Sequence, residues 1–490
     1  MNAKGLTQSV AGATKWSGVT EVCARLISPI TNMILARLLI PEVFGVVQTL
    51  TLVVSFAEIF TDAGFQKYLV QREFKNEEDL NLSTNVAFWT NLGFSVLLWL
   101  VIALCAEPIA GMVGSQGHGT AVAVMSLQIP MLAFSSIQMA RYRRDMDFKS
   151  LFFVRMVTSL VPLVVTVPLA VWLRSYWALV AGNLCKDLIN AVLLTWRSKW
   201  KPGLSYQLGK LKDMLSFSVW TIVENVFIWL TANIGTFIVG IALTEREVGL
   251  YKTTISTVNG YMNVISATVM QVLFSGLSRC QNDEKAFRGL FFRFQRMTAL
   301  LVIPLGFGTY VFRRLVVAIL LGDQWTEVSD FLGLWSLTSA LAIVLSSMNS
   351  EAFRSKGRPR LSVLGQILQL VVLVPVLLVM MDHGFYQLSI TRSLLRLEGI
   401  AVSILLLHCA IKIPFWQVLK NVYPSFLSAM IMAAVGMVIS TRMPSLWGQV
   451  LGVAVCVAVY GACMLLLPAG RRQLLEVPVL NKLLRKCRIK

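Results

Sequence analysis

Several ionisable residues interrupt long apolar stretches of this sequence, and they are its best candidates for chemistry. Arg25 follows Glu21 by four residues, so the two share one face of a helix. Lys186 and Asp187 lie in the middle of a second apolar stretch, and Glu224 lies in a third. A charged group is costly inside a membrane, so each of these residues either neutralises a neighbour or contacts something polar that crosses the membrane.

Two interpretations of each group remain open. Arg25 either binds an anionic group, with Glu21 holding the guanidinium or acting as its proton-sensitive partner, or forms an ion pair with Glu21 that locks helix packing. Glu224 either couples transport to protons or pairs with Arg25 as a gate. Lys186 either lines a cavity as a cation or is neutralised by Asp187 and neighbouring helices. Asp187 is, with Glu21 and Glu224, a candidate for coupling or gating.

Small polar residues accompany these charges. Asn183 and Asn190 lie on roughly the same helix face as the lysine, and Ser256, Asn259 and Asn263 follow one side of a later apolar stretch. Their amide and hydroxyl groups can form hydrogen bonds with a polar ligand. We predict that these residues line a cavity. Helix packing is the alternative, because small polar residues also hold membrane helices together.

The sequence carries none of the motifs that indicate an enzyme. Its three histidines are scattered, and its eight cysteines form no CxxC pair. It contains no GxxxxGK(S/T) phosphate loop, no HExxH and no GxSxG. We therefore expect no catalytic residue, no metal ion and no cofactor. Any movement of a ligand across the membrane would be driven by a proton gradient, a sodium gradient or mass action.

The composition indicates that apolar helices position these residues. Of the 490 residues, 14% are charged, against roughly 25% in a soluble domain, and 56% are apolar. A helix needs about 20 mostly apolar residues to cross a bilayer, and about fourteen stretches qualify. They run approximately over 14–37, 42–64, 82–106, 119–140, 152–173, 175–196, 216–240, 252–275, 291–312, 328–351, 362–381, 397–413, 422–440 and 447–467.

The basic residues support this count. The net charge is +19, and most of the 44 Lys and Arg residues fall in alternate loops on the same side as both termini. Because positive loops stay inside, we expect both termini to be cytoplasmic. The positive charge then reflects membrane topology, and we expect no nucleic-acid partner.

An internal repeat divides the predicted helices into two sets. A shift of 204 residues places Trp16 on Trp220 and Gly45 on Gly249. Chance similarity between apolar segments is the alternative explanation. The repeat predicts an all-α integral membrane protein with two pseudo-symmetric six-helix lobes around a central cavity and two further C-terminal helices. The lobes cover residues 1–200 and 201–415, and residues 416–490 hold the last two spans and a basic cytoplasmic tail.

Eight short segments are similar to one family. They are LARLLIPEVFGVVQT (35–49), DAGFQKYLVQR (62–72), MDFKSL (146–151), YWALVAGNL (176–184), VGLYKTT (248–254), VLFSGLSRCQND (272–283), LLGDQW (320–325) and SKGRPRLS (355–362). With them the chain resembles the polysaccharide (oligosaccharide-lipid) flippases of the Wzx type, within the multidrug/oligosaccharidyl-lipid/polysaccharide exporter superfamily.

The resemblance implies a substrate, a location and partners. The substrate would be an undecaprenyl-pyrophosphate-linked oligosaccharide, moved by alternating access from the cytoplasmic to the outer leaflet of a bacterial inner membrane. Partners would be membrane lipid, a polysaccharide polymerase and a chain-length regulator. Where the family often has Asn-hydrophobic-Asp, this chain has Asn233-Ile234-Gly235, so a cation-coupled mechanism does not carry over to that position. The alternatives are a flippase of the lipid precursor of peptidoglycan and a multidrug/cation antiporter of the same superfamily.

Overall fold

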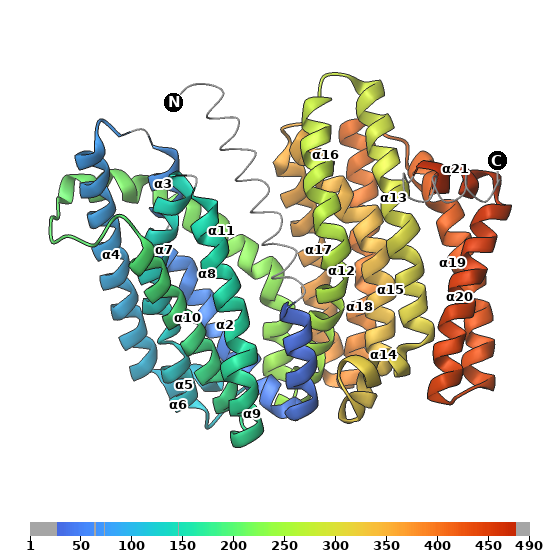
Figure 1. Cartoon of the computed structure of the whole chain (residues 1–490), viewed down its shortest axis with the longest axis horizontal. Helices are drawn as coiled ribbons and strands as arrows, with labels where there is room; N and C mark the ends of the chain where they lie inside the picture. The colour runs from blue at the N-terminus through green and yellow to red at the C-terminus, as the bar shows by residue number, and fades with distance from the viewer. Residues whose placement is uncertain (1–26, 63–64, 73, 146, 477–490) are drawn as a thin grey trace. The chain divides into compact units, whose positions relative to one another are not determined.

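The computed structural model describes residues 27–62, 65–72, 74–145 and 147–476, and every element in these ranges is helical (Figure 1). The chain divides into two units, residues 1–252 and 253–490. The first unit begins with a helix over residues 27–38. It continues with α2 (Pro41–Asp62), α3 (Phe65–Gln71), α4 (Glu77–Leu104), α5 (Ala106–Met112), α6 (Gly119–Met125), α7 (Gln128–Arg144), α8 (Phe148–Val161), the π-turn η1 (Pro162–Thr166), α9 (Val167–Leu173), α10 (Tyr176–Arg197) and α11 (Leu208–Ala242).

The helix α12 (Glu245–Arg279) runs from the first unit into the second. The second unit continues with α13 (Glu284–Val311), α14 (Arg313–Leu320), η2 (Asp323–Val328), α15 (Ser329–Ala342), the π-turn η3 (Ile343–Ser347), α16 (Met348–Ser355), α17 (Pro359–Met380), η4 (Met381–His383), α18 (Phe385–Ile411), α19 (Phe415–Arg442), α20 (Leu446–Leu466) and α21 (Pro468–Glu476).

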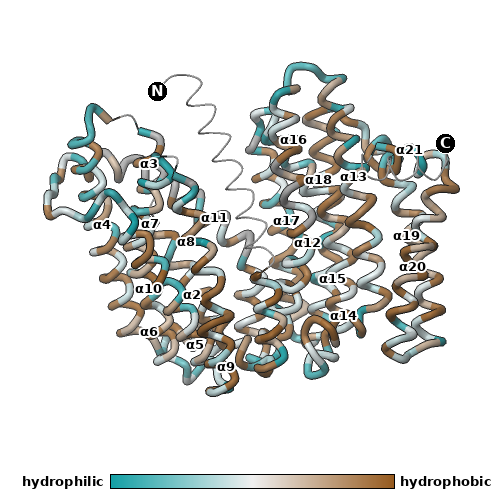
Figure 2. The backbone as a smooth tube through the Cα atoms, viewed as in Figure 1, coloured by the Kyte–Doolittle hydropathy of each residue, from teal (hydrophilic) through white to brown (hydrophobic). Residues whose placement is uncertain are grey.

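Eleven helices in the described ranges are long and apolar enough to cross a membrane. Each coincides with one of the expected spans, which confirms the all-α membrane fold. Figure 2 shows hydrophobic residues along the bodies of these helices and hydrophilic residues towards their ends. The other three expected spans fall on 14–37, most of which lies outside the described residues, and on α11 and α12, which have 35 residues each. A count of about fourteen is compatible with this arrangement.

One helix differs from its predicted bounds. The span expected over 397–413 is the 27-residue helix α18, which begins at Phe385. Arg392 and Arg396 fall between the spans expected over 362–381 and 397–413, in a segment expected to be a loop, but they lie inside a helix that is long enough to span the membrane. The hydropathy of the sequence placed the start of the helix too late, because the two arginines lower the mean hydropathy at this end. The helix can include them because their guanidinium groups stack on an aromatic ring.

In the first unit, α7 packs against α4, α10, α3 and α2. The core beside α7 contains the fully buried Phe88, whose ring lies against Phe134 and against Trp200 of the segment after α10. Asn76 begins α4 by accepting a hydrogen bond from the backbone N–H of Asp79 at 2.8 Å, which satisfies one of the free donors of the first turn.

The connection from α10 to α11 follows the side of α4. The side chain of Asn85 accepts from the backbone N–H of Gly203 at 3.1 Å and donates to the hydroxyl of Ser205 at 2.7 Å. Trp89 donates through its indole N–H to the carbonyl of Gly203 at 2.7 Å. This segment, the longest predicted cytoplasmic loop, is thus held by side chains of a neighbouring helix.

Two glycines bring α2 and α12 into backbone contact. A Cβ atom on Gly45 would lie 1.7 Å from the carbonyl oxygen of Glu245, and one on Gly249 would lie 1.9 Å from that of Pro41. No side chain fits at either glycine, so the helices meet backbone to backbone. Gly45 and Gly249 are 204 residues apart, and so are Pro41 and Glu245, which is the shift found in the sequence. We call these four residues the glycine contact.

Polar interactions flank the glycine contact. Arg246 lies 3.7 Å from Glu42, again a pair related by the 204-residue shift, and His118 Nδ1 lies 3.2 Å from Glu245. The hydroxyls of Thr49 and Ser115 are 2.6 Å apart and buried. These residues adjoin loops that are predicted to be external, so they join helix ends on the predicted outer side.

In the second unit, a polar cluster attaches α19 and α21 to α13. Arg296 of α13 pairs with both carboxylate oxygens of Glu476 at the end of α21, at 3.0 and 2.5 Å. It also donates to Asn421 of α19 at 2.7 Å. A two-pronged arginine–carboxylate pair has a fixed geometry, so this cluster holds α19 and α21 against α13.

Candidate functional site

The first unit contains a polar cavity of about 340 Å³ inside its helices. Four helical segments form it: residues 27–38, α2, the α8–η1 segment and α10. Among the described residues, its polar lining consists of hydroxyl and amide side chains and one cation: Ser28, Thr31, Asn32, Gln48, Thr51, Thr158, Ser159, Thr166, Asn183 and Lys186. Such a lining can form several hydrogen bonds with a polyhydroxylated ligand.

A π-turn shapes one wall of the cavity. Pro162 begins η1, where the helix widens because proline has no N–H for the regular ladder. At the end of η1, Thr166 packs against α10 so closely that a Cβ on Gly182 would lie 2.0 Å from the threonine hydroxyl oxygen. The close approach at Gly182 places the next residue, Asn183, and then Lys186, at the cavity wall.

Lys186 has a carboxylate beside it. Its Nζ lies 3.5 Å from Oδ1 of Asp187, and the other carboxylate oxygen accepts a hydrogen bond of 2.7 Å from Gln128 of α7. The lysine side chain is 39% exposed, whereas that of Asp187 is 6% exposed. The buried carboxylate therefore lowers the net charge of the site, while the ammonium group remains open to a ligand.

The structure shows which of the predicted residues of α10 line the cavity. Asn183 and Lys186 line the cavity, Asp187 is buried behind it, and Asn190 is not among the lining residues. The two interpretations of Lys186 describe one geometry, because the residue both lines a cavity and contacts Asp187. Substrate binding by Asn183 and Lys186 stays a prediction.

The predicted residues of α12 are not among the lining residues of this cavity. Ser256, Asn259 and Asn263 lie on α12 within the second unit, where Ser256 and Asn263 are exposed and Asn259 is half-buried. The Ser256 hydroxyl donates to the carbonyl of Thr253 at 3.1 Å. Their proposed role in a cavity stays a prediction.

Three predicted residues have side chains that the structure does not describe. Arg25 and Glu21 lie outside the described residues. Glu224 is part of α11, but its side chain lies outside the described part. Their roles in binding, coupling or gating stay predictions.

Sequence reasoning did not select most of the lining residues. Asn32, Gln48 and Thr158 are single polar residues on three different helical segments, so no local spacing connects them. The one signal was Pro162 inside an apolar span, since π-turns often occur at functional sites.

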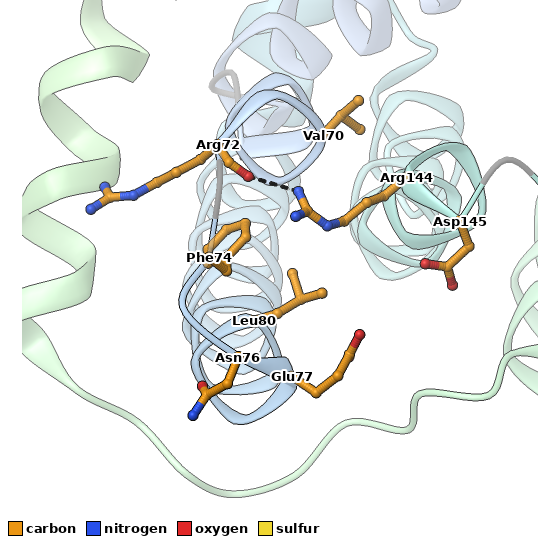
Figure 3. A pocket seen from close by; sticks show the side chains of 8 residues that line it. All are labelled: Val70, Arg72, Phe74, Asn76, Glu77, Leu80, Arg144 and Asp145. Atoms are coloured by element: carbon orange, nitrogen blue, oxygen red, sulfur yellow. Dashed lines mark hydrogen bonds between the residues drawn. The ribbon is translucent and has the colours of Figure 1, made fainter. Parts of the chain in front are cut away.

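A second hollow, of about 560 Å³, lies at the predicted cytoplasmic end of the first unit (Figure 3). Arg144 crosses it and donates to the carbonyl oxygens of Leu69 and Arg72, each at 2.8 Å. Its guanidinium also lies 4.7 Å from the ring centre of Phe74. The Arg72 side chain extends to the other side of its helix in Figure 3, and its guanidinium bonds to the hydroxyl of Tyr68. Arg144 thus caps the end of α3, which is a structural role.

These features define the class of protein: an all-helical, multi-pass membrane protein with a polar cavity among its helices. The family follows from the sequence. Residues 34–330 match the model of the polysaccharide biosynthesis protein family, and the chain belongs to that family. The resemblance to Wzx-type flippases is confirmed by this match and by the relatives below.

Two of the relatives have names that state a polysaccharide-related biosynthetic process. The succinoglycan biosynthesis transport protein ExoT of Rhizobium meliloti (strain 1021) is 24% identical over 341 residues, covering 70% of this chain and 67% of the relative. The lipopolysaccharide biosynthesis protein WzxC of Escherichia coli (strain K12) is 19% identical over 378 residues, covering 76% of this chain and 75% of the relative.

Solved structures support the fold. The lipid II flippase MurJ in an inward closed conformation superposes with a TM-score of 0.71 and 13% identity, over 91% of this chain and 97% of that one. An inward-facing multidrug transporter of the MATE family gives 0.58 and 11% identity, over 84% and 94%. At these identities the likeness concerns the fold alone.

Proposed function

We propose that this protein moves undecaprenyl-diphosphate-linked oligosaccharide repeat units from the cytoplasmic to the outer leaflet for export of a surface polysaccharide. The observation that carries the proposal is the cavity among the spans of a polysaccharide biosynthesis protein, lined by hydroxyls, amides and Lys186. Hydrocarbon offers sugars no hydrogen bonds, so a flippase must supply them along the path.

The cavity lining suggests how the transporter handles this substrate. Hydroxyl and amide groups such as those of Thr51 and Asn183 exchange hydrogen bonds with sugar hydroxyls that have lost water. Lys186 supplies positive charge to an anionic part of the substrate. Transport changes the position of the substrate and not its covalent structure, so no bond is made or broken and no catalytic residue is needed.

The remaining parts of the mechanism belong to the same proposal. Access to the cavity alternates between the two sides of a bacterial inner membrane, with both termini in the cytoplasm. Arg25 receives the diphosphate, and Glu224 titrates if protons drive the step. A polymerase and a chain-length regulator act on the units that this protein delivers.

Deletion of the gene in its host tests the proposal. We expect complete repeat units to accumulate on the undecaprenyl lipid, measured by mass spectrometry, and the surface polymer to disappear. The wild-type gene restores the polymer. Unchanged glycolipids and unchanged polymer in the deletion strain, in a host without a second flippase, refute the proposal. Accumulation of the peptidoglycan lipid precursor instead assigns the chain to that pathway.

Two asparagines on α10 form a matched pair for testing the cavity. Asn183→Ala removes a side chain that lines the cavity, and Asn190→Ala removes the same group from the same helix outside the lining. We expect the Asn190 variant to restore the polymer fully and the Asn183 variant to restore less at equal expression. Equal restoration by both excludes this cavity from the transport path.

A further inference from the structure

Backbone-to-backbone contacts gather at the predicted outer end of the first unit. The glycine contact joins α2 to α12 at this end, which is the end of α5 and α6 in Figure 1. A second contact joins the loop after α5 to α11, because a Cβ atom on Gly114 would lie 1.7 Å from the carbonyl oxygen of Gly240. Gly114 has a φ of +82°, so a side chain there would be strained as well as blocked. We call residues 41–49, 113–118 and 240–249 the outer seal.

Side-chain pairs connect the same segments, and both pairs are hydrated. Arg246 lies 3.7 Å from Glu42, and Glu245 lies 3.2 Å from Nδ1 of His118. These side chains are between 22 and 50% exposed, and exposed pairs contribute little to stability. Helices that meet at glycines have no interdigitated side chains to disengage at these points. The outer seal can therefore open and close at a low cost.

The polar cavity lies on the inner side of the outer seal. Helix α2 begins at Pro41 at the predicted outer end, and Gly45 lies one turn further along it. Gln48 and Thr51, which line the cavity, follow Gly45 by three and six residues. At a rise of 1.5 Å per residue, they lie about 5 and about 9 Å further along the helix axis. The outer seal thus lies along α2 between the cavity and the predicted outer surface.

We propose that the outer seal is the external gate of this transporter. The hairpin that joins α11 to α12 separates from α2 and from the loop after α5, which opens the cavity to the outer side and releases its ligand. The hairpin is the segment that moves, because α12 continues into the second unit, and α11 and α12 begin the second set of six helices in the predicted repeat. The proposal rests on the proposed function and on the predicted orientation of the helices.

The test measures access to the cavity from the outer side. Thr158→Cys places a thiol in the cavity lining, in a protein whose eight native cysteines are replaced by alanine. Spheroplasts are treated with a membrane-impermeant maleimide, and labelling is read by mass spectrometry on the peptide that contains residue 158. The labelling rate reports how often the cavity opens outwards, and it does not depend on which ligand is transported.

Alanine at either glycine of the glycine contact opens the outer seal. Gly45→Ala and Gly249→Ala place a Cβ atom 1.7 and 1.9 Å from a carbonyl oxygen of the opposite helix, so the closed state loses stability relative to the open one. We expect each variant to raise the labelling rate about tenfold, a shift of about 1.4 kcal/mol in the equilibrium between closed and open. The control Gly93→Ala, whose Cβ meets nothing within 4 Å, labels at the wild-type rate.

A disulfide holds the outer seal closed. A Cβ atom on Gly240 would lie 3.7 Å from Cγ2 of Thr49 of α2, which is compatible with the separation of about 3.5–4.5 Å between the Cβ atoms of a disulfide. The double variant Thr49→Cys with Gly240→Cys is oxidised with copper phenanthroline. We expect labelling at residue 158 to fall to background and export of the surface polymer to stop. A reducing agent restores both, which shows that the variant is folded.

The two perturbations give outcomes that decide the proposal. Labelling that is unchanged by both alanine variants and by the completed disulfide overturns the gate. Export at the wild-type rate with the disulfide formed overturns it as well. If labelling responds as expected while deletion of the gene leaves glycolipids unchanged, the outer seal gates the cavity and the proposed function alone fails.

Discussion

Replacement of Gly45 by alanine tests the backbone contact between α2 and α12. The new Cβ would lie 1.7 Å from the carbonyl oxygen of Glu245, whereas ordinary contact begins at 3.4 Å, so the helices must separate locally by about 1.7 Å. Overpacking of this kind costs about 1–3 kcal/mol. In a unit of 252 residues, 1 kcal/mol changes the melting temperature by roughly 2–4 °C, so we expect a fall of about 2 °C or more.

The assay is thermal unfolding of the purified protein followed by tryptophan fluorescence. Gly93→Ala is the control, because Gly93 lies in the interior of α4 and a Cβ there meets nothing within 4 Å. Alanine is a better helix former than glycine by about 0.5–1 kcal/mol, so this control melts at the same temperature as the wild type or higher. If the Gly45 and Gly93 variants melt together, the backbone contact is not rigid and the reasoning is wrong.

Two further predictions concern charged pairs. Lys186→Met leaves the buried Asp187 without its ion pair, so we expect it to destabilise the protein by about 1–3 kcal/mol. Adding Asp187→Asn removes the unpaired charge and restores part of the lost melting temperature. Equal melting temperatures of the single and double variants would contradict this coupling. Arg296→Ala breaks the bond to Glu476 and speeds tryptic cleavage within α21. The control Arg288→Ala loses an exposed pair with Glu284 and a hydrogen bond to the carbonyl of Lys412, neither of which involves α21, so it leaves the cleavage rate unchanged. Equal rates in the two variants would show that the Arg296 cluster does not attach α21.

The fold could be predicted largely from the sequence because length and hydropathy suffice to define a membrane helix. Eleven expected spans coincide with helices of the structure. The start of α18 could not be predicted in this way, since Arg392 and Arg396 lower the hydropathy and only the packing of Trp335 shows why the helix accepts them.

The candidate site was predictable only in part. Asn183 and Lys186 stood out because polar residues are rare in the middle of a span. Gln48 and Thr166 did not, because an isolated polar residue in a span is as typical of helix packing as of a cavity. These residues line a cavity only because four helical segments pack around it. That arrangement is a result of tertiary packing, including the close contact at Gly182, and local sequence does not show it.

The glycine contact has a consequence for the history of this chain. Its two glycines are equivalent positions of the repeat, and each meets the backbone four residues before the other, as in an isologous interface between two identical subunits. The two glycine codons mutate separately, yet a side chain gained at either position pushes the same two backbones apart. Each of the two glycine positions is therefore restricted in the residues it can accept by the backbone of the helix that carries the other.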